Sequence, residues 1–180
     1  MTDAPQPPTA SPATAERLVC FAHGKESGPW GLKITRLAQI ARQQGCEILS
    51  PDYSHTPDPR VRVAQLVGLK PQARRLVLVG SSMGGYVSAM ACAQLRPHAL
   101  FLMAPALYFP GWDEEPEDIP SLCSVVHGWH DDIVPAERAL RFARRHRAEL
   151  HLIDAEHTLN ARIDTVAVLF DDFLARALAS

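Results

Sequence analysis

The feature that most constrains this chain is a short apolar run that leads directly into a glycine-rich turn around a serine. The apolar run is Leu76–Val79, residues 80–85 read Gly-Ser-Ser-Met-Gly-Gly, and 86–95 has helical character. A strand, a Gly-x-Ser-x-Gly turn and a helix, in that order, are the setting in which this motif presents a nucleophilic serine. Glycines two positions to either side of Ser82 let strand and helix approach without a Cβ clash. The same motif also occurs around serines without a catalytic role. Whether Ser82 is a nucleophile therefore depends on whether the chain also supplies an acid and a histidine.

Apolar runs of strand length alternate with segments of helical spacing along the chain. The runs are 18–22, 46–49, 76–79, 100–103, 122–126 and 150–153, and the helical segments are 30–44, 63–67, 86–95, 135–147 and 163 onward. This alternation predicts an α/β fold, a three-layer α/β/α sandwich built on a mainly parallel six-stranded sheet. A length of 180 residues suits one such domain with a substantial core.

Composition excludes several classes of partner. Residues 1–15 are rich in Pro, Ala and Thr, so we expect a disordered tail ahead of a domain over 16–180, and no signal peptide. No apolar run is long enough to span a membrane, and a net charge of −2 gives no electrostatic case for nucleic acid or an anionic membrane. Four separated cysteines are expected to be buried, reduced thiols of a cytoplasmic protein: Cys20, Cys46, Cys92 and Cys123.

Functional residues of a parallel sheet gather just beyond the carboxyl ends of its strands. His23-Gly24-Lys25 follows the first run. We expect the backbone N–H of Lys25, with that of Met83, to face a substrate oxyanion. A loop histidine such as His23 more simply satisfies its loop by hydrogen bonding, and we expect no catalytic role for its side chain.

Two acids and a histidine follow later runs. Asp131 and Asp132 come after the run 122–126, and either could fix the tautomer of a catalytic histidine; Asp131 is preferred and Asp132 is the reserve. Their alternative role is helix capping or solvent exposure ahead of the helix at 135. His157 follows the run 150–153 and is placed to reach Ser82 as a general base, although a lone histidine there could equally be a loop residue.

Taken together, Ser82, Asp131 and His157 occur in the chain order of one hydrolase architecture. The sequence resembles the α/β-hydrolase superfamily, especially its small, lidless bacterial esterase-like members, over residues 17–178. Further matching residues are His23-Gly24, His127-Gly128 and Val134-Pro135. The resemblance implies a minimal α/β-hydrolase fold. It also favours Asp131, because the family's acid stands four residues after the histidine of His-Gly.

The resemblance implies acyl transfer to water without a metal or organic cofactor. In that reading His157 takes the Ser82 proton, Asp131 orients His157, and an acyl-serine forms. The chain has no room for the leading strands of larger members, and 104–120 is the only candidate cover for the site. An open site of this kind suits small, soluble esters or thioesters, with esterase favoured over thioesterase or peptidase only for simplicity. Four aromatic residues could line an acyl pocket or simply pack: Trp30, Tyr108, Phe109 and Trp112.

Two alternatives belong to other functional classes. The first is metal-dependent hydrolysis by His127, His130, Asp131 and Asp132, although adjacent residues at one strand tip rarely all face one ion. The second is a binding module that keeps the fold without catalysis, since a fold does not dictate function.

Overall fold

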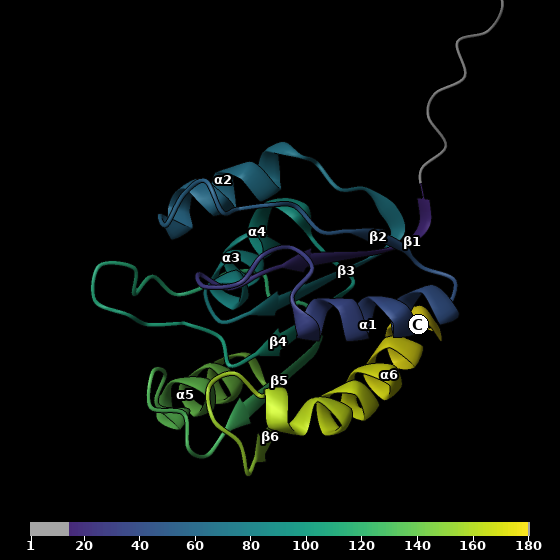
Figure 1. The fold of residues 1–180 in the computed structure, drawn as a ribbon. Helices are drawn as coiled ribbons and strands as arrows, with labels where there is room; N and C mark the ends of the chain where they lie inside the picture. The colour runs from purple at the N-terminus through teal and green to yellow at the C-terminus, as the bar shows by residue number, and fades with distance from the viewer. Residues whose placement is uncertain (1–14, 180) are drawn as a thin grey trace, which may run out of the picture.

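A computed structural model describes residues 15–179 of the chain (Figure 1). The strands are β1 (Ala15–Ala22), β2 (Glu47–Leu49), β3 (Ala73–Ser81), β4 (Ala99–Met103), β5 (Leu122–Gly128) and β6 (Glu149–Ile153). The helices are α1 (Leu32–Gln43), α2 (Pro59–Gly68), α3 (Met83–Met90), α4 (Cys92–Leu95), α5 (Ala136–His146) and α6 (Ile163–Ala179), the last preceded by a 3₁₀ turn, η1 (Asn160–Arg162). The expected tail, 1–15, lies outside the described residues except for Ala15, which begins β1.

The six strands form one sheet in the order β2-β1-β3-β4-β5-β6, and every neighbouring pair is parallel. In Figure 1, α1 and α6 lie side by side on one face of this sheet, and α2, α3 and α5 cover the other. The predicted three-layer α/β/α sandwich is confirmed, with a sheet that is wholly rather than mainly parallel.

Each face of the sheet carries its own apolar core. Phe101 of β4 packs its ring against Phe170 and Phe173 of α6, with ring centroids 5.2 Å apart in both pairs. On the opposite face, Tyr86 of α3 and Phe142 of α5 are buried against the strands. Because both faces are covered, the strands are continuously apolar instead of alternating, which is why they are recognisable as unbroken apolar runs in the sequence.

The direction of chain winding reverses between β1 and β3. The chain leaves β1 for α1 on one face and leaves β3 for α3 on the other, so a crevice opens at the carboxyl ends of these neighbouring strands. Ala22 pairs with Gly80 in the parallel register. The loop after β1 therefore lies beside the turn after β3.

Local signals explain several element boundaries. The Asp58 carboxylate accepts the Arg60 N–H at 2.8 Å and caps α2, with Pro59 in its first turn. Helix α1 is followed by Gly45, whose φ of 77° ends it. The single helix expected over 86–95 is instead α3 and α4. The Ala91 N–H still donates to the Val87 carbonyl at 3.1 Å, so helical hydrogen bonding continues across the break.

All four cysteines are buried free thiols, as expected. Burial raises the pKa of Cys20 and of Cys92 to about 12, which removes their thiolate reactivity at neutral pH. Within residues 15–179, no helix combines the length and the apolar character needed to cross a bilayer.

Candidate active site

Ser82 lies in the sharp turn between β3 and α3, in a conformation that non-glycine residues rarely adopt. Its φ is 54° and its ψ is −120°, a backbone strain on the order of 1–3 kcal/mol. The surrounding backbone enforces it: the Ser82 N–H donates to the Met103 carbonyl at 2.9 Å, and the Ser82 carbonyl accepts the Gly85 N–H at 2.8 Å. The turn thereby places the Ser82 hydroxyl at the carboxyl edge of the sheet.

Close backbone packing explains the glycines around Ser82. A Cβ on Gly84 would lie 1.9 Å from the Ala22 carbonyl oxygen, and a Cβ on Gly80 would lie 2.3 Å from the Gly84 carbonyl oxygen. Both contacts are with backbone atoms, which cannot move aside without disrupting the sheet. Strand β1, the turn and α3 can approach this closely only because neither position carries a side chain.

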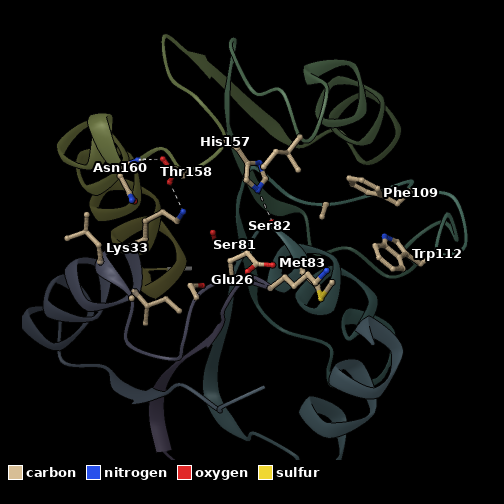
Figure 2. A pocket seen from close by; sticks show the side chains of 18 residues that line it. Glu26, Lys33, Ser81, Ser82, Met83, Phe109, Trp112, His157, Thr158 and Asn160 are labelled. Atoms are coloured by element: carbon tan, nitrogen blue, oxygen red, sulfur yellow. Dashed lines mark hydrogen bonds between the residues drawn. The ribbon is translucent and has the colours of Figure 1, made fainter. Parts of the chain in front are cut away.

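The structure brings Ser82, His157 and Asp131 into one hydrogen-bonded chain. His157, in the loop after β6, has its Nε2 atom 2.9 Å from Ser82 Oγ, a contact drawn in Figure 2. Its Nδ1 atom lies 2.7 Å from Asp131 Oδ2, in the loop after β5. An imidazole in this position can donate through Nδ1–H to the carboxylate while Nε2 accepts a proton from the hydroxyl.

The side chain of Asp131 is fully buried, and its hydrogen bonds favour the ionised carboxylate. Its Oδ1 atom accepts the N–H groups of Ile133 at 3.0 Å and Val134 at 2.8 Å. Burial alone would raise the pKa of this carboxyl, but the hydrogen bonds from His157 and from the two N–H groups outweigh burial and hold the pKa below its usual range. A carboxylate charge is therefore maintained beside His157.

His127 supports this carboxylate from the other side. It is fully buried, and its Nε2–H donates to the Val134 carbonyl at 2.8 Å while lying 3.3 Å from Asp131 Oδ2. Burial lowers the pKa of His127, so the ring is neutral at physiological pH. His127 thus contacts the loop that carries Asp131 at both Asp131 and Val134.

The two candidate acids face different surroundings, and the four candidate metal ligands do not converge on one point. Asp132 is exposed, so only Asp131 reaches His157. The exposed His130 pairs with Asp154 at 2.9 Å and not with its sequence neighbours. Residues 15–179 contain no group of three His, Cys, Asp or Glu side chains arranged to bind a metal ion.

Lys25 and Met83 both line the cavity at Ser82. Met83 is the first residue of α3, where backbone N–H groups have no acceptor within the helix. The Lys25 N–H likewise has no hydrogen-bond acceptor in the part of the chain that the structure describes. Two backbone donors without a partner among the described residues, on residues that line the same cavity as Ser82, are candidates to stabilise an oxyanion.

His23 holds the loop that carries Lys25. It is buried, and its Nε2 atom accepts the Tyr53 N–H at 2.9 Å, which leaves Nδ1–H to donate to the Gly24 carbonyl at 2.7 Å. Burial is the main reason that its pKa lies below the usual value. His23 therefore satisfies its loop by hydrogen bonding, and it is not among the residues that line the cavity at Ser82.

A cavity of about 600 Å³ opens at Ser82 and His157. Of the four aromatic residues suggested by the sequence, Phe109 and Trp112 line it, with ring centroids 5.8 Å apart. Trp30 and Tyr108 do not. Trp30 is exposed and packs against Arg42, whereas Tyr108 is buried and its hydroxyl donates to Glu115 at 2.8 Å.

The segment 104–120, the candidate cover and named here the cover segment, forms part of the cavity lining. Ala106, Phe109 and Trp112 of the segment are cavity-lining residues. An acidic residue holds this segment against the domain. Glu114 forms an ion pair with Arg60 of α2 and accepts a hydrogen bond from the Tyr86 hydroxyl at 3.2 Å. The cover segment is thus part of the folded domain and not a separate lid domain.

Several polar cavity residues were not anticipated from the sequence, among them Lys33, Thr158 and Asn160. Lys33 is the second residue of α1, and its Nζ donates to the Thr158 carbonyl at 2.5 Å, across 125 residues of sequence. In the sequence, Lys33 is simply a polar residue at the start of a helix, and nothing there marks it as a site residue. Thr158 could have been suspected only because it follows His157.

Comparison with known proteins agrees with this architecture. A protein of the α/β-hydrolase superfamily from Xanthomonas campestris pv. campestris is 32% identical, with a TM-score of 0.81, and the match covers 91% of this chain and 99% of that chain. Est1E from Butyrivibrio proteoclasticus shares the fold at 19% identity, with a TM-score of 0.78 and coverage of 96% and 92%. An α/β serine hydrolase without a lid from Xanthomonas campestris shares it at 20% identity, with a TM-score of 0.64 and coverage of 94% and 87%.

A search of the curated proteins found no match. The model of the alpha/beta hydrolase family, in contrast, matches residues 21–179, which is nearly the whole described domain. The resemblance seen in the sequence is confirmed by this match and by the lidless structural relative. The chain belongs to the alpha/beta hydrolase family.

Proposed function

We propose that the protein is a serine hydrolase that cleaves small carboxylic esters or thioesters through an acyl-serine intermediate. The observation that carries the proposal is the continuous hydrogen-bonded chain from Ser82 Oγ through His157 to Asp131. Ser82 is the nucleophile, His157 the general base and Asp131 the group that orients the imidazole. The chain's membership of a hydrolase family supports this assignment.

In the first half-reaction, His157 Nε2 takes the Ser82 proton as Oγ attacks the substrate carbonyl carbon. The carbonyl oxygen becomes an oxyanion, which the N–H groups of Lys25 and Met83 stabilise. The imidazolium that forms is stabilised by the ionised Asp131, 2.7 Å from Nδ1. His157 then returns the proton to the leaving oxygen or sulfur as the bond to the carbonyl carbon breaks.

In the second half-reaction, His157 takes a proton from water, whose oxygen attacks the acyl-serine carbonyl. The same two N–H groups stabilise the second oxyanion, and protonation of Ser82 Oγ releases the acid. Phe109 and Trp112 offer the apolar group of the substrate a surface within the cavity.

Esters are the preferred substrate class on the strength of one relative. Est1E, which shares the fold, has also been solved with ferulic acid bound. That ligand is an aromatic carboxylic acid, and the aromatic residues of the present cavity suit an acyl or alcohol group of similar character.

A fluorophosphonate probe tests the proposal directly, because it phosphonylates only an activated serine. Labelling of the folded wild-type protein, with the adduct mapped by peptide mass spectrometry to Ser82 and absent from Ser82→Ala, is the expected result. A panel of phenyl esters and matched thioesters then ranks the substrates. A folded wild-type protein that takes no probe and hydrolyses no ester is a binding module, and the proposal fails.

A further inference from the structure

The cavity has two chemically different walls on opposite sides of the Ser82–His157 pair. Figure 2 shows Phe109 and Trp112 on one side, and Lys33, Thr158 and Asn160 on the other. A substrate whose reacting carbonyl lies at Ser82 would extend an apolar group toward the first wall. The second wall carries the Lys33 cation and other polar groups, while Leu32 and Ile34, which flank Lys33 in α1, also line the cavity.

Lys33 is a partly buried ammonium whose hydrogen-bond partner is neutral. Its Nζ donates to the Thr158 carbonyl at 2.5 Å, and no carboxylate of residues 15–179 forms an ion pair with it. Burial lowers the pKa of Lys33, and the charge of Asp131 opposes this only in part. The Asp131 carboxylate is already occupied by His157 and two backbone N–H groups.

The surroundings of Lys33 leave its charge available to a ligand. Glu26 also lines the cavity but is exposed to solvent. Helix α1 has no acid in its first turn and no side-chain cap at Gly31, so its positive end adds to the charge of Lys33. The Asn160 side chain, on the same wall, carries amide donors.

We propose that the site selects anionic esters, binding a substrate carboxylate at Lys33 and Asn160 while the apolar group lies against Phe109 and Trp112. This inference rests on the proposed serine-hydrolase function and names its substrate class. A carboxylate at Lys33 would form a charge-assisted hydrogen bond in a partly desolvated setting, where such bonds are strongest. The substrate would be an ester or thioester that bears a second, free acid group.

Two matched pairs of esters test the proposal, because the carboxylate could belong to the acyl or to the alcohol half. Phenyl hydrogen glutarate is compared with phenyl pentanoate, and 4-acetoxyphenylacetate with its methyl ester. In at least one pair, kcat/KM of wild type should favour the anionic ester by about tenfold or more, which corresponds to about 1.4 kcal/mol. The ratio within a pair cancels effects common to both substrates.

Variants of Lys33 separate charge recognition from support of the His157 loop. Lys33→Gln retains a donor for the Thr158 carbonyl but removes the charge, and should bring the anionic-to-neutral ratio close to one. Lys33→Arg retains the charge and should restore most of the preference. Lys70→Gln is the matched control, since Lys70 is exposed and precedes β3 at the opposite end of the sheet, and it should leave the ratio unchanged.

The outcomes distinguish the preference for anionic esters from the serine-hydrolase function on which it rests. Equal kcat/KM within both pairs in wild type, or an equal loss for both members in Lys33→Gln, overturns the anionic preference and leaves the serine hydrolase intact. A protein that hydrolyses none of the four esters and takes no fluorophosphonate fails as a serine hydrolase.

Discussion

The guanidinium of Arg62 lies buried beneath the loop after β1, where its Nη1 atom donates to the Gly24 carbonyl at 3.2 Å. Its Nε atom donates to the Thr56 carbonyl at 2.9 Å. Helix α2 thus holds the backbone of the residue directly before Lys25. Because Lys25 is the proposed first donor to the oxyanion, we predict that Arg62 positions this donor.

Replacement of Arg62 should therefore lower kcat more than it raises KM. Arg62→Lys keeps the charge but cannot donate to both carbonyls, so the Lys25 N–H loses its fixed direction. Loss of one oxyanion donor costs about 10²-fold to 10³-fold in kcat. Steady-state kinetics on a phenyl ester, with the folded fraction measured at the assay temperature, gives the result.

Arg74→Lys serves as the control for this variant, because Arg74 is exposed and pairs with Glu16 at the far end of β3. Its kinetics should match wild type. If the activity lost in Arg62→Lys is accounted for by its unfolded fraction alone, Arg62 contributes to stability and not to positioning.

The close approach of β1 and α3 makes Gly84 intolerant of any side chain. A Cβ there would lie 1.9 Å from the Ala22 carbonyl oxygen, so Gly84→Ala should reduce the free energy of unfolding by about 3 kcal/mol or more through overpacking. Gly68→Ala is the matched change, because a Cβ at Gly68 meets nothing within 4 Å. Chemical denaturation should find Gly68→Ala close to wild type or slightly more stable; a stable Gly84→Ala would refute the packing argument.

Asp131→Asn should inactivate the enzyme without unfolding it. The asparagine oxygen can still accept the Ile133 and Val134 N–H groups, but its amide would donate to His157 Nδ1 and leave the proton on Nε2. That tautomer cannot accept the Ser82 proton, and the expected loss in kcat is about 10⁴-fold. Asp132→Asn, at the exposed neighbouring acid, should retain wild-type kcat; equal losses in both variants would make the assignment of Asp131 wrong.

The strands and the candidate catalytic side chains could be predicted because their sequence signals are local. Leu76–Val79 is an unbroken apolar run because β3 is covered on both faces, and the glycines around Ser82 follow from one tight turn. Asp131 and His157 could be proposed because each follows such a run. Parallel strands place those positions at one edge whatever the order of strands in the sheet.

Contacts between distant segments could not be predicted in the same way. Arg62 occupies a helical position that an arginine usually exposes, and its burial is explained by contacts with the carbonyls of Gly24 and Thr56 and with the Tyr53 ring. Tyr108 and Phe109 are neighbours in sequence, yet one packs inward and the other lines the cavity. Lys33 contacts the Thr158 carbonyl, and no sequence periodicity links the two residues.

Acid should destabilise the fold through His127, whose burial lowers its pKa below the usual value. The unfolded chain takes up a proton at this residue near pH 6.5, about the ordinary pKa of histidine, whereas the folded protein keeps the ring neutral to lower pH. Below about pH 6.5 the unfolded state therefore binds more protons, and the free energy of unfolding falls as pH falls. The slope from one histidine is up to about 1.4 kcal/mol per pH unit, and it flattens once pH drops below the folded-state pKa.

His127→Gln isolates this contribution, because glutamine can donate to the Val134 carbonyl but does not titrate. Urea denaturation between pH 7.5 and 5 should give the variant a shallower loss of stability than wild type, so that the two stabilities converge as pH falls. The buried His23, whose pKa is also lowered chiefly by burial, remains in both proteins and accounts for part of the slope that persists. His55→Gln, at an exposed loop position, should keep the wild-type slope. Parallel pH profiles for wild type and His127→Gln would mean that His127 titrates alike in the folded and unfolded chains, contrary to its burial against Asp131.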